Sequence, residues 1–366
     1  MNENLRNTWL NAVRSLEISA VGIAPNASPM TWQPYQNAME MGIPPQLEYL
    51  VRNAHCRLDL ESIMPGTRSI LCCALSLPVF VSETSRHYAR FCAIGDYHQV
   101  IRERLSALDQ ILKSFDLIHQ SRICVDSAPV LERELAVRAG LGSIGFNRMV
   151  IHPDFGSFIA LGELFVDADL SLLREELDVC TSHVPHADAE TDLLTPGKSH
   201  CCPPESRRCI QACPAHALTS NGYDVNRCLS YWSTQHKGDI PEEFASAMDD
   251  MLWGCDRCQN ACPRNAHLKN DKFADLANPL YSLTFEEILS LSARQIRKKL
   301  EGSPIADAHP YMLQRNTCIV IGNLNLTKYT PLLIDITSTH PCDWVRSSAN
   351  RALALFDAGN SSQIKP

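Results

Sequence analysis

Cysteines are the residues of this sequence with the clearest potential for chemistry. The 366-residue chain has 16 Cys, and the segments CCPPESRRCIQACP and CDRCQNACP each end in Cys-x-x-x-Cys-Pro. In bacterial ferredoxins such a run binds a 4Fe–4S cluster, and its last cysteine ligates the neighbouring cluster. The spacing therefore predicts two 4Fe–4S clusters. Zinc is the alternative, but zinc sites use paired cysteine knuckles without an exchanged Cys-Pro ending.

Both runs lack cysteines that a ferredoxin run has. Leu252 stands where the second run should begin, and Cys228 is the candidate replacement. With the exchanged fourth ligand, we expect one cluster to use Cys213, Cys228, Cys255 and Cys258. We expect the other to use Cys209, Cys262, Cys201 and Cys202, with Cys180 as a possible substitute.

Composition restricts the class of protein. The net charge of −8 argues against broad, charge-driven nucleic-acid binding, although it leaves room for a local basic patch. The chain has no apolar run long enough to span a bilayer, and its N-terminal sequence lacks the pattern of a secretory signal. We expect a cytoplasmic protein, where cysteines are more often metal ligands than disulfides.

Strand-like and helix-like segments alternate in the N-terminal half. Apolar runs predict strands over 18–24, 69–77, 122–127 and 158–167, and helical periodicity covers 1–20 and 98–115. This alternation predicts an α/β domain over residues 1–175. A polar linker over 171–205 leads into an iron–sulfur module over 176–275, which we expect to be ferredoxin-like.

The C-terminal part, 276–366, is predicted to be helical. Thr284 and Glu287 form a capping-box pattern before the helix 285–300. Three amphipathic segments follow over 311–324, 330–340 and 343–356, and the last two are similar to a HEAT repeat. A generic helical tail is the alternative. The predicted fold class is therefore a mixed α+β and α/β chain in three parts.

Several segments in one order resemble the epoxyqueuosine reductase family. They are PGTRSILCCALSLP (65–78), YARFCAIGDYHQVIRERLSAL (88–108), VDSAPVLERELAVRAGLG (125–142) and GCDRCQNACPRN (254–265). The resemblance implies a cobalamin enzyme with two 4Fe–4S clusters. It would reduce epoxyqueuosine to queuosine at the wobble position of tRNA, as a monomer. Electrons would come from a donor such as flavodoxin or ferredoxin.

The resemblance also implies roles for individual residues. Asp126, in Val-Asp-Ser, matches the family's candidate proton donor, and we expect apolar Val125 and Pro129 to raise its pKa. A simple helix-capping role is the alternative. The positions that match cofactor and substrate surroundings are Arg57, Tyr97, Asp126, Gln235 and Lys237, for which ordinary surface positions are the alternative.

Substrate binding and substrate identity leave alternatives. A basic face formed by Arg294, Arg297, Lys298, Lys299, Arg346 and Arg351 is a candidate for tRNA phosphates, or simply a solvated helix surface. Ser143 and Phe146 replace the Trp and Lys usual in the family. The function therefore has two alternatives: a cobalamin and iron–sulfur reductase of a small molecule, similar to reductive dehalogenases, and a non-catalytic electron carrier.

Overall fold

The structure is a computed structural model, and it describes residues 3–77, 85–92, 95–178, 207–220, 222–266, 268 and 283–362. Cys180, Cys201 and Cys202 lie outside these residues. The chain forms two compact units. The first contains 1–77, 97–212 and 258–270, and the second contains 78–96, 213–257 and 271–366. The segments of the two units alternate along the chain. The three consecutive domains with boundaries at 175 and 275 stay a prediction.

A four-stranded sheet forms the centre of the first unit. Its order is β1 (Ala20–Pro25), β2 (Ser69–Ser76), β6 (Ile159–Val166) and β3 (Ser121–Cys124). These strands match the four predicted apolar runs. Every pairing is antiparallel, so the alternation of strands and helices does not produce the parallel sheet typical of α/β proteins.

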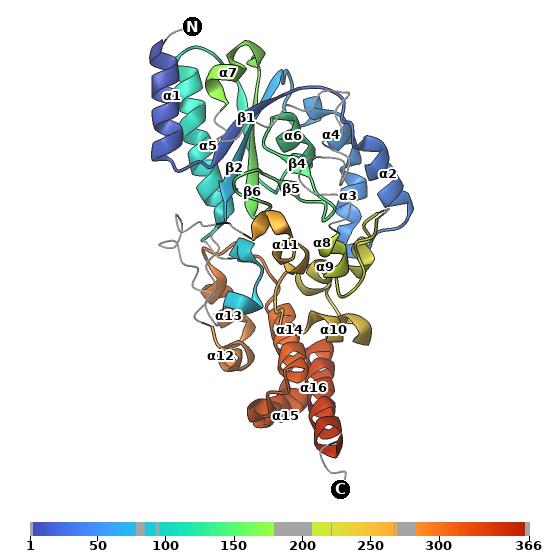
Figure 1. Cartoon of the computed structure of the whole chain (residues 1–366). Coiled ribbons are helices and arrows are strands. Elements are labelled where there is room, and N and C mark those ends of the chain that lie inside the picture. Colours follow the sequence, from blue (N-terminus) through green and yellow to red (C-terminus); the bar gives the residue numbers. More distant parts are fainter. Residues whose placement is uncertain are drawn as a thin grey trace. The chain divides into compact units, whose positions relative to one another are not determined.

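Helices cover both faces of this sheet (Figure 1). One face packs on α5 (Tyr97–Ser114), which also contacts α1 (Glu3–Ser15). Gly162 lets α5 approach, because a Cβ there would lie 2.4 Å from Ile101 Cγ2. The other face packs on α6 (Glu132–Arg138), and a Cβ on Gly22 would lie 2.0 Å from the carbonyl oxygen of Ala139. The sheet is thus enclosed between helical layers.

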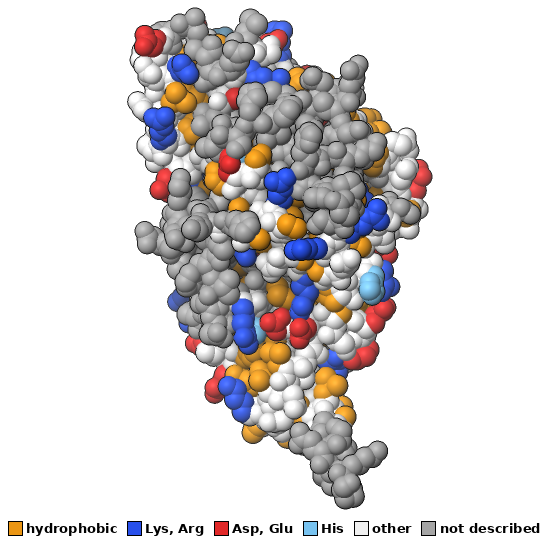
Figure 2. Space-filling model, in the orientation of Figure 1, with side chains coloured by type: hydrophobic (Ala, Val, Ile, Leu, Met, Phe, Trp, Pro, Cys, Tyr) orange, Lys and Arg blue, Asp and Glu red, His pale blue; other side chains and the backbone are white. Residues whose placement is uncertain are grey.

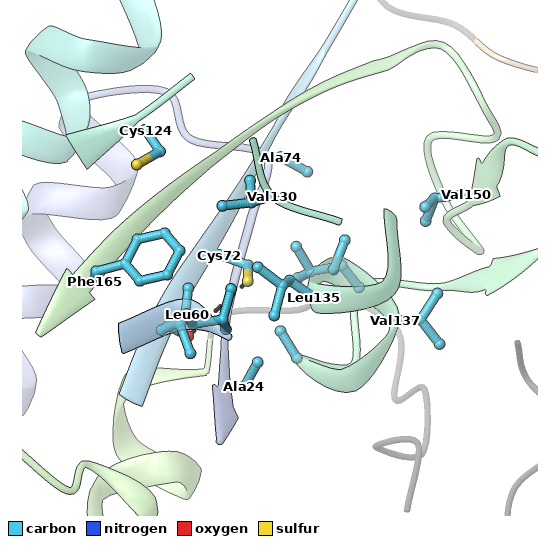
Figure 3. Packing of buried hydrophobic residues seen from close by; sticks show 14 of the residues in the cluster. Ala24, Leu60, Cys72, Ala74, Cys124, Val130, Leu135, Val137, Val150 and Phe165 are labelled. Carbon is cyan, nitrogen blue, oxygen red and sulfur yellow. Dashed lines mark hydrogen bonds between the residues drawn. The ribbon is translucent and has the colours of Figure 1, made fainter. Parts of the chain in front are cut away.

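An apolar layer fills the space between the sheet and α6, and Figure 3 shows Phe165, Leu135 and Cys72 within it. The strand register places Gly22, Cys72, Glu163 and Cys124 in one row across the four strands. Side chains directly opposite one another point to the same face of a sheet. The carboxyl of Glu163 therefore lies in this apolar layer.

The beginning of the predicted linker belongs to the fold of the first unit. Residues 171–178 form a 3-10 turn and helix α7 (Arg174–Leu177). Trp9 Nε1 donates to the carbonyl of Leu177 at 2.9 Å, and Arg174 Nη2 donates to the carbonyl of Ile23 at 2.6 Å. The linker prediction is therefore wrong for these residues, because hydrogen bonds from the Trp9 and Arg174 side chains anchor them. The rest of that segment up to 206 lies outside the described residues.

Shorter elements complete the first unit. They are α2 (Trp32–Glu40), α3 (Glu48–Arg52), α4 (Ala54–Leu58), the two-stranded sheet of β4 (Ser143–Ile144) and β5 (Val150–Ile151), and α8 (Arg208–Gln211).

The second unit is built mainly from helices. It contains α9 (Leu229–Thr234), α10 (Glu242–Met248), α12 (Phe285–Ser290), α13 (Ala293–Leu300), α14 (Pro310–Asn323), α15 (Thr330–Thr339) and α16 (Asp343–Ser362). The short helix α11 (Arg257–Asn260) begins at the last residue of this unit, and its remaining residues belong to the first. The capping box of Thr284 and Glu287 is confirmed, and Ser292 and Gln295 form a second one at α13. Helix α16 packs on α14 and α15, and the HEAT-like repeat stays a prediction.

Candidate active site

Asp126 lies in a tight turn directly after β3. Its φ of 55° is in the left-handed region, which non-glycine residues adopt at some energetic cost. The turn is closed by the Ser127 N–H, which donates to the Val125 carbonyl at 2.5 Å. The Tyr97 hydroxyl donates to Asp126 Oδ2, and His98 Nε2 lies 3.4 Å from the same oxygen. Tyr97 and His98, at the start of α5, stack with ring centroids 4.0 Å apart.

These contacts decide the charge of Asp126. Hydrogen bonding from His98 lowers the pKa of Asp126; Tyr97 lowers it further, and together they outweigh desolvation. The side chain is 52% exposed, so Val125 and Pro129 do not desolvate it enough to raise its pKa. The expectation of a raised pKa is therefore wrong, and the resting carboxyl is ionised at neutral pH. The helix-capping alternative is wrong as well, because the N-cap of α6 is Leu131.

Arg57 lies in the same unit beside two tyrosines. Its guanidinium is 5.7 Å from the ring centroid of Tyr35, and Nη1 donates to the Asn53 carbonyl at 3.2 Å. Burial raises the pKa of Tyr49, the charge of Arg57 lowers it, and the charge of Asp126 raises it. Tyr49 therefore interacts with both Arg57 and Asp126, which places three of the predicted residues (Arg57, Tyr97 and Asp126) in one neighbourhood.

Gln235 and Lys237 belong to the second unit, where they follow α9. The loop that carries them is anchored by Arg315, a fully buried residue of α14. Arg315 Nη1 donates to the carbonyls of His236 and Gly238, both at 2.7 Å, and Nη2 donates to the carbonyl of Trp232 at 2.9 Å. A single guanidinium thus satisfies three backbone acceptors and holds the loop in shape.

Asn316 extends this anchor toward the cysteine segment. Its Nδ2 donates to the carbonyls of Ser233 at 2.9 Å and Leu252 at 2.8 Å. Its Oδ1 accepts from both Nε and Nη2 of Arg315. Two adjacent residues of α14 therefore hold the end of α9 and the chain just before Cys255.

Within the first unit, Cys209 and Cys262 are buried in one cluster with Phe146 and Ile151, and Cys258 packs against it. Arg207 lies 5.6 Å from the ring centroid of Phe146. Phe146, which replaces the Lys usual in the family, therefore places an aromatic ring beside three predicted cluster ligands.

Within the second unit, Cys213, Cys228 and Cys255 are half-buried thiols. The Ala217 N–H donates to Cys213 Sγ at 3.3 Å, which suits a thiolate ligand. Burial raises the pKa of Cys255 to about 12; a backbone hydrogen bond from Arg257 opposes this, and the nearby Cys228 adds to it. In the described part of the chain, no three His, Cys, Asp or Glu residues are grouped to hold a single metal ion. The thiol-only donor set with amide donors fits iron–sulfur ligation.

The hairpin of β4 and β5 has unused hydrogen-bond donors. Asn147 Nδ2, Arg148 Nε and His152 Nε2 are buried and have no partner among the residues that the structure describes. Burial lowers the pKa of His152 to about 4, and its Nδ1 accepts from the Asp154 N–H, so Nε2 is the protonated nitrogen. These three atoms could donate hydrogen bonds to acceptor oxygens of a bound ligand.

The basic residues of the second unit differ in their partners. Arg351 is paired with Glu242 at 2.6 Å and Arg346 with Asp343, so neither carries a free charge. On α13, Arg294, Arg297, Lys298 and Lys299 are exposed and have no ion pair within the described ranges. Figure 2 shows one face of the molecule, where Lys and Arg side chains are interspersed with Asp and Glu. The predicted basic face is thus reduced to α13.

Some site residues were not singled out from the sequence. His98 directly follows the predicted Tyr97, and this adjacency within one helical turn was its only signal. Arg315 had none, because its role depends on contacts between segments distant in sequence. Among the described residues, every helix is too short or too polar to cross a membrane.

Comparison with known proteins identifies the family. Residues 202–265 match the model "4Fe-4S double cluster binding domain", and residues 57–127 match "Epoxyqueuosine reductase QueG, DUF1730". The epoxyqueuosine reductase of Francisella cf. novicida (strain Fx1) is 30% identical over 328 residues, which are 85% of each chain. That of Aliivibrio fischeri (strain ATCC 700601 / ES114) is 32% identical over 297 residues, 78% of this chain and 74% of the relative.

A solved structure has the same fold. The crystal structure of an epoxyqueuosine reductase with an epoxyqueuosine-modified tRNA-Tyr stem loop has a TM-score of 0.78 and 20% identity. The match covers 99% of this chain and 95% of the other. The mixed helix and strand architecture is therefore confirmed, and residues 202–265 form a double 4Fe–4S binding domain. The chain belongs to the epoxyqueuosine reductase family.

Proposed function

We propose that this chain reduces epoxyqueuosine to queuosine in tRNA. Membership of the family carries the proposal, because a relative of that name is 30% identical over 85% of both chains. The Asp126 turn supports it. Asp126, Tyr97 and His98 form a compact set of groups that can hold and move protons.

In this proposal Asp126 delivers a proton to the oxygen of the opening epoxide. The oxygen develops negative charge as its bond to carbon breaks, so a positioned acid lowers the barrier. Asp126 must first receive a proton, because its hydrogen bonds with His98 and Tyr97 keep its resting pKa low. The left-handed turn presents the half-exposed carboxyl away from the core.

The cofactors follow from the donor sets. We propose that Cys213, Cys228, Cys255 and Cys258 ligate one cluster, and that Cys209 and Cys262, with cysteines outside the described residues, ligate the other. Cobalamin, when bound, would supply a strongly reducing cobalt centre. Its amide side chains would find donors in Asn147, Arg148 and His152. Arg57, Tyr97, Gln235 and Lys237 remain proposed binding residues.

Helix α13 is the proposed contact for the tRNA backbone. Its exposed cations form no ion pair among the described residues, although the charge of Lys299 acts on the Glu287 carboxyl. RNA stem-loops are bound largely through phosphates and shape. A flavodoxin or ferredoxin donor and a monomeric enzyme complete the proposal.

An anaerobic assay tests this function. Protein reconstituted with iron, sulfide and cobalamin is mixed with a strong reductant and tRNA carrying epoxyqueuosine, and nucleosides are read by mass spectrometry. We expect queuosine from the wild type and none above background from Asp126→Asn, with unchanged tRNA binding. Protein that holds both clusters and cobalamin but forms no queuosine would instead be a reductase of another substrate, consistent with Ser143 and Phe146.

A further inference from the structure

Three carboxyl groups meet where β3, α6 and β6 come together. The Asp126 N–H donates to Glu132 Oε1 at 2.9 Å, so the Glu132 carboxyl lies directly against the Asp126 turn. Glu163 interacts electrostatically with both of them from the apolar layer behind. The three carboxyls therefore run from the half-exposed Asp126, through the half-buried Glu132, to the fully buried Glu163.

Glu163 closes this series on the inner side. It is 0% exposed, and neither carboxyl oxygen has a hydrogen-bond partner in the described structure. Its row neighbours Cys72 and Cys124 and the adjacent apolar layer offer no countercharge. An isolated carboxylate is strongly disfavoured in such surroundings, so Glu163 is neutral.

Glu132 and Asp126 are driven to opposite protonation states. Burial raises the pKa of Glu132 to about 7, and the negative charge of Asp126 contributes to this rise. Hydrogen bonds from His98 and Tyr97 lower the pKa of Asp126. Two neighbouring groups whose environments separate their pKa values in this way often divide acid and base roles between them.

The reaction requires more than one proton. Converting an epoxide to a carbon–carbon double bond takes two electrons and two protons, and the oxygen leaves as water. The external reductant supplies the electrons. Asp126 is ionised at rest, so it has no proton of its own to give when the reaction begins.

We propose, building on the function proposed above, that Glu132 stores a proton and transfers it to Asp126, which delivers it to the departing oxygen. The O–H bond on Glu132 breaks and an O–H bond on Asp126 forms. Glu132 is left as a carboxylate that regains a proton from solvent between turnovers. Its half-buried position permits this exchange, whereas Glu163 is sealed from water.

The groups that face Glu132 are consistent with this role. They come from α5, β3 and its following turn, β6 and α6 itself, and they are His98, Cys124, Asp126, Glu163 and Arg133. The one cation with permanent charge among them is Arg133, which is exposed. Burial and the negative charge of Asp126 outweigh its opposing effect on the pKa of Glu132.

Glu132→Gln distinguishes a proton store from a structural anchor. The Gln carbonyl oxygen can still accept from the Asp126 N–H, so the turn is preserved, but the acidic proton is lost. In single-turnover assays of the reconstituted enzyme we expect roughly a 10- to 100-fold lower rate at pH 6.5. The wild-type rate should fall as pH rises through about 7, where Glu132 loses its proton, and this fall should be absent in Glu132→Gln.

Infrared difference titration gives a readout that does not depend on turnover. The wild type should show a protonated carboxyl band that disappears near pH 7, and Glu132→Gln should lack this titrating band. Glu103→Gln is the control, because Glu103 is an exposed residue of α5. It should match the wild type in both the single-turnover rate and the infrared titration.

The two proposals fail in different ways. If Glu132→Gln forms queuosine at the wild-type rate with the same pH profile, the proton-store role is wrong and the function stands. If the wild type forms no queuosine, the proposed function is wrong. The infrared titration then still decides whether Glu132 holds a proton at neutral pH.

Discussion

Replacing Arg315 with Met should loosen the loop that carries Gln235 and Lys237. The guanidinium donates to the carbonyls of Trp232, His236 and Gly238. Methionine keeps most of the volume but leaves these acceptors without a donor. An unsatisfied, largely buried acceptor costs about 1 kcal/mol or more, so the three together predict a loss of about 3 kcal/mol. For a domain of 150–250 residues this lowers Tm by about 6–12 °C.

Thermal unfolding of the reconstituted protein measures this loss. Arg315→Lys should fall between Met and wild type, because an ammonium group keeps the charge but cannot span three carbonyls with a planar fork. Arg294→Met is the control in the same unit; it is exposed and should change stability by less than about 0.5 kcal/mol. If Arg315→Met lowers Tm no more than Arg294→Met does, the anchor contributes nothing to stability and the reasoning is refuted.

Three further changes test other parts of the structure. Cys228→Ser should lose the iron of one cluster and retain that of the other in iron analysis and EPR, and full iron content would exclude Cys228 as a ligand. Arg297→Glu should weaken tRNA binding and flatten its salt dependence, whereas Arg351→Gln, already paired with Glu242, should change neither; equal effects would remove α13 as the contact. Gly22→Ala should destabilise the protein by about 3 kcal/mol in thermal unfolding, because the new Cβ would lie 2.0 Å from the Ala139 carbonyl oxygen; an unchanged Tm would contradict this packing.

Local structure was largely predictable from the sequence. The run 69–77 is strand Ser69–Ser76, and 98–115 is helix Tyr97–Ser114, because continuous apolar runs and 3.6-residue periodicity are strong local signals. The capping box at Thr284 was also predictable, because the Thr-x-x-Glu pattern is a local signal. Strand order and direction were not predictable, since these depend on contacts between segments far apart in sequence.

The chemistry of individual groups was less predictable. Asp126 was identified as a candidate proton donor through resemblance. The predicted direction of its pKa shift was wrong, because its exposure and its hydrogen bond with His98 depend on the folded structure. Glu132 reads from sequence as an ordinary acidic residue in the first turn of a helix. Burial in the fold and the nearby charge of Asp126, which are properties of the folded chain, give this carboxyl unusual surroundings.

The interleaved units have a consequence for how the protein is made on the ribosome. The first unit includes residues 258–270, and Asn265 Oδ1 accepts from the buried N–H of Ser157 at 2.9 Å. Gln259 Oε1 accepts from the Ser157 hydroxyl at 3.0 Å. A nascent chain that has not yet emerged beyond residue 265 leaves these polar groups unsatisfied, so the first unit completes its fold late in translation. Chains truncated before this point should therefore be favoured substrates for proteases and chaperones rather than stable N-terminal fragments.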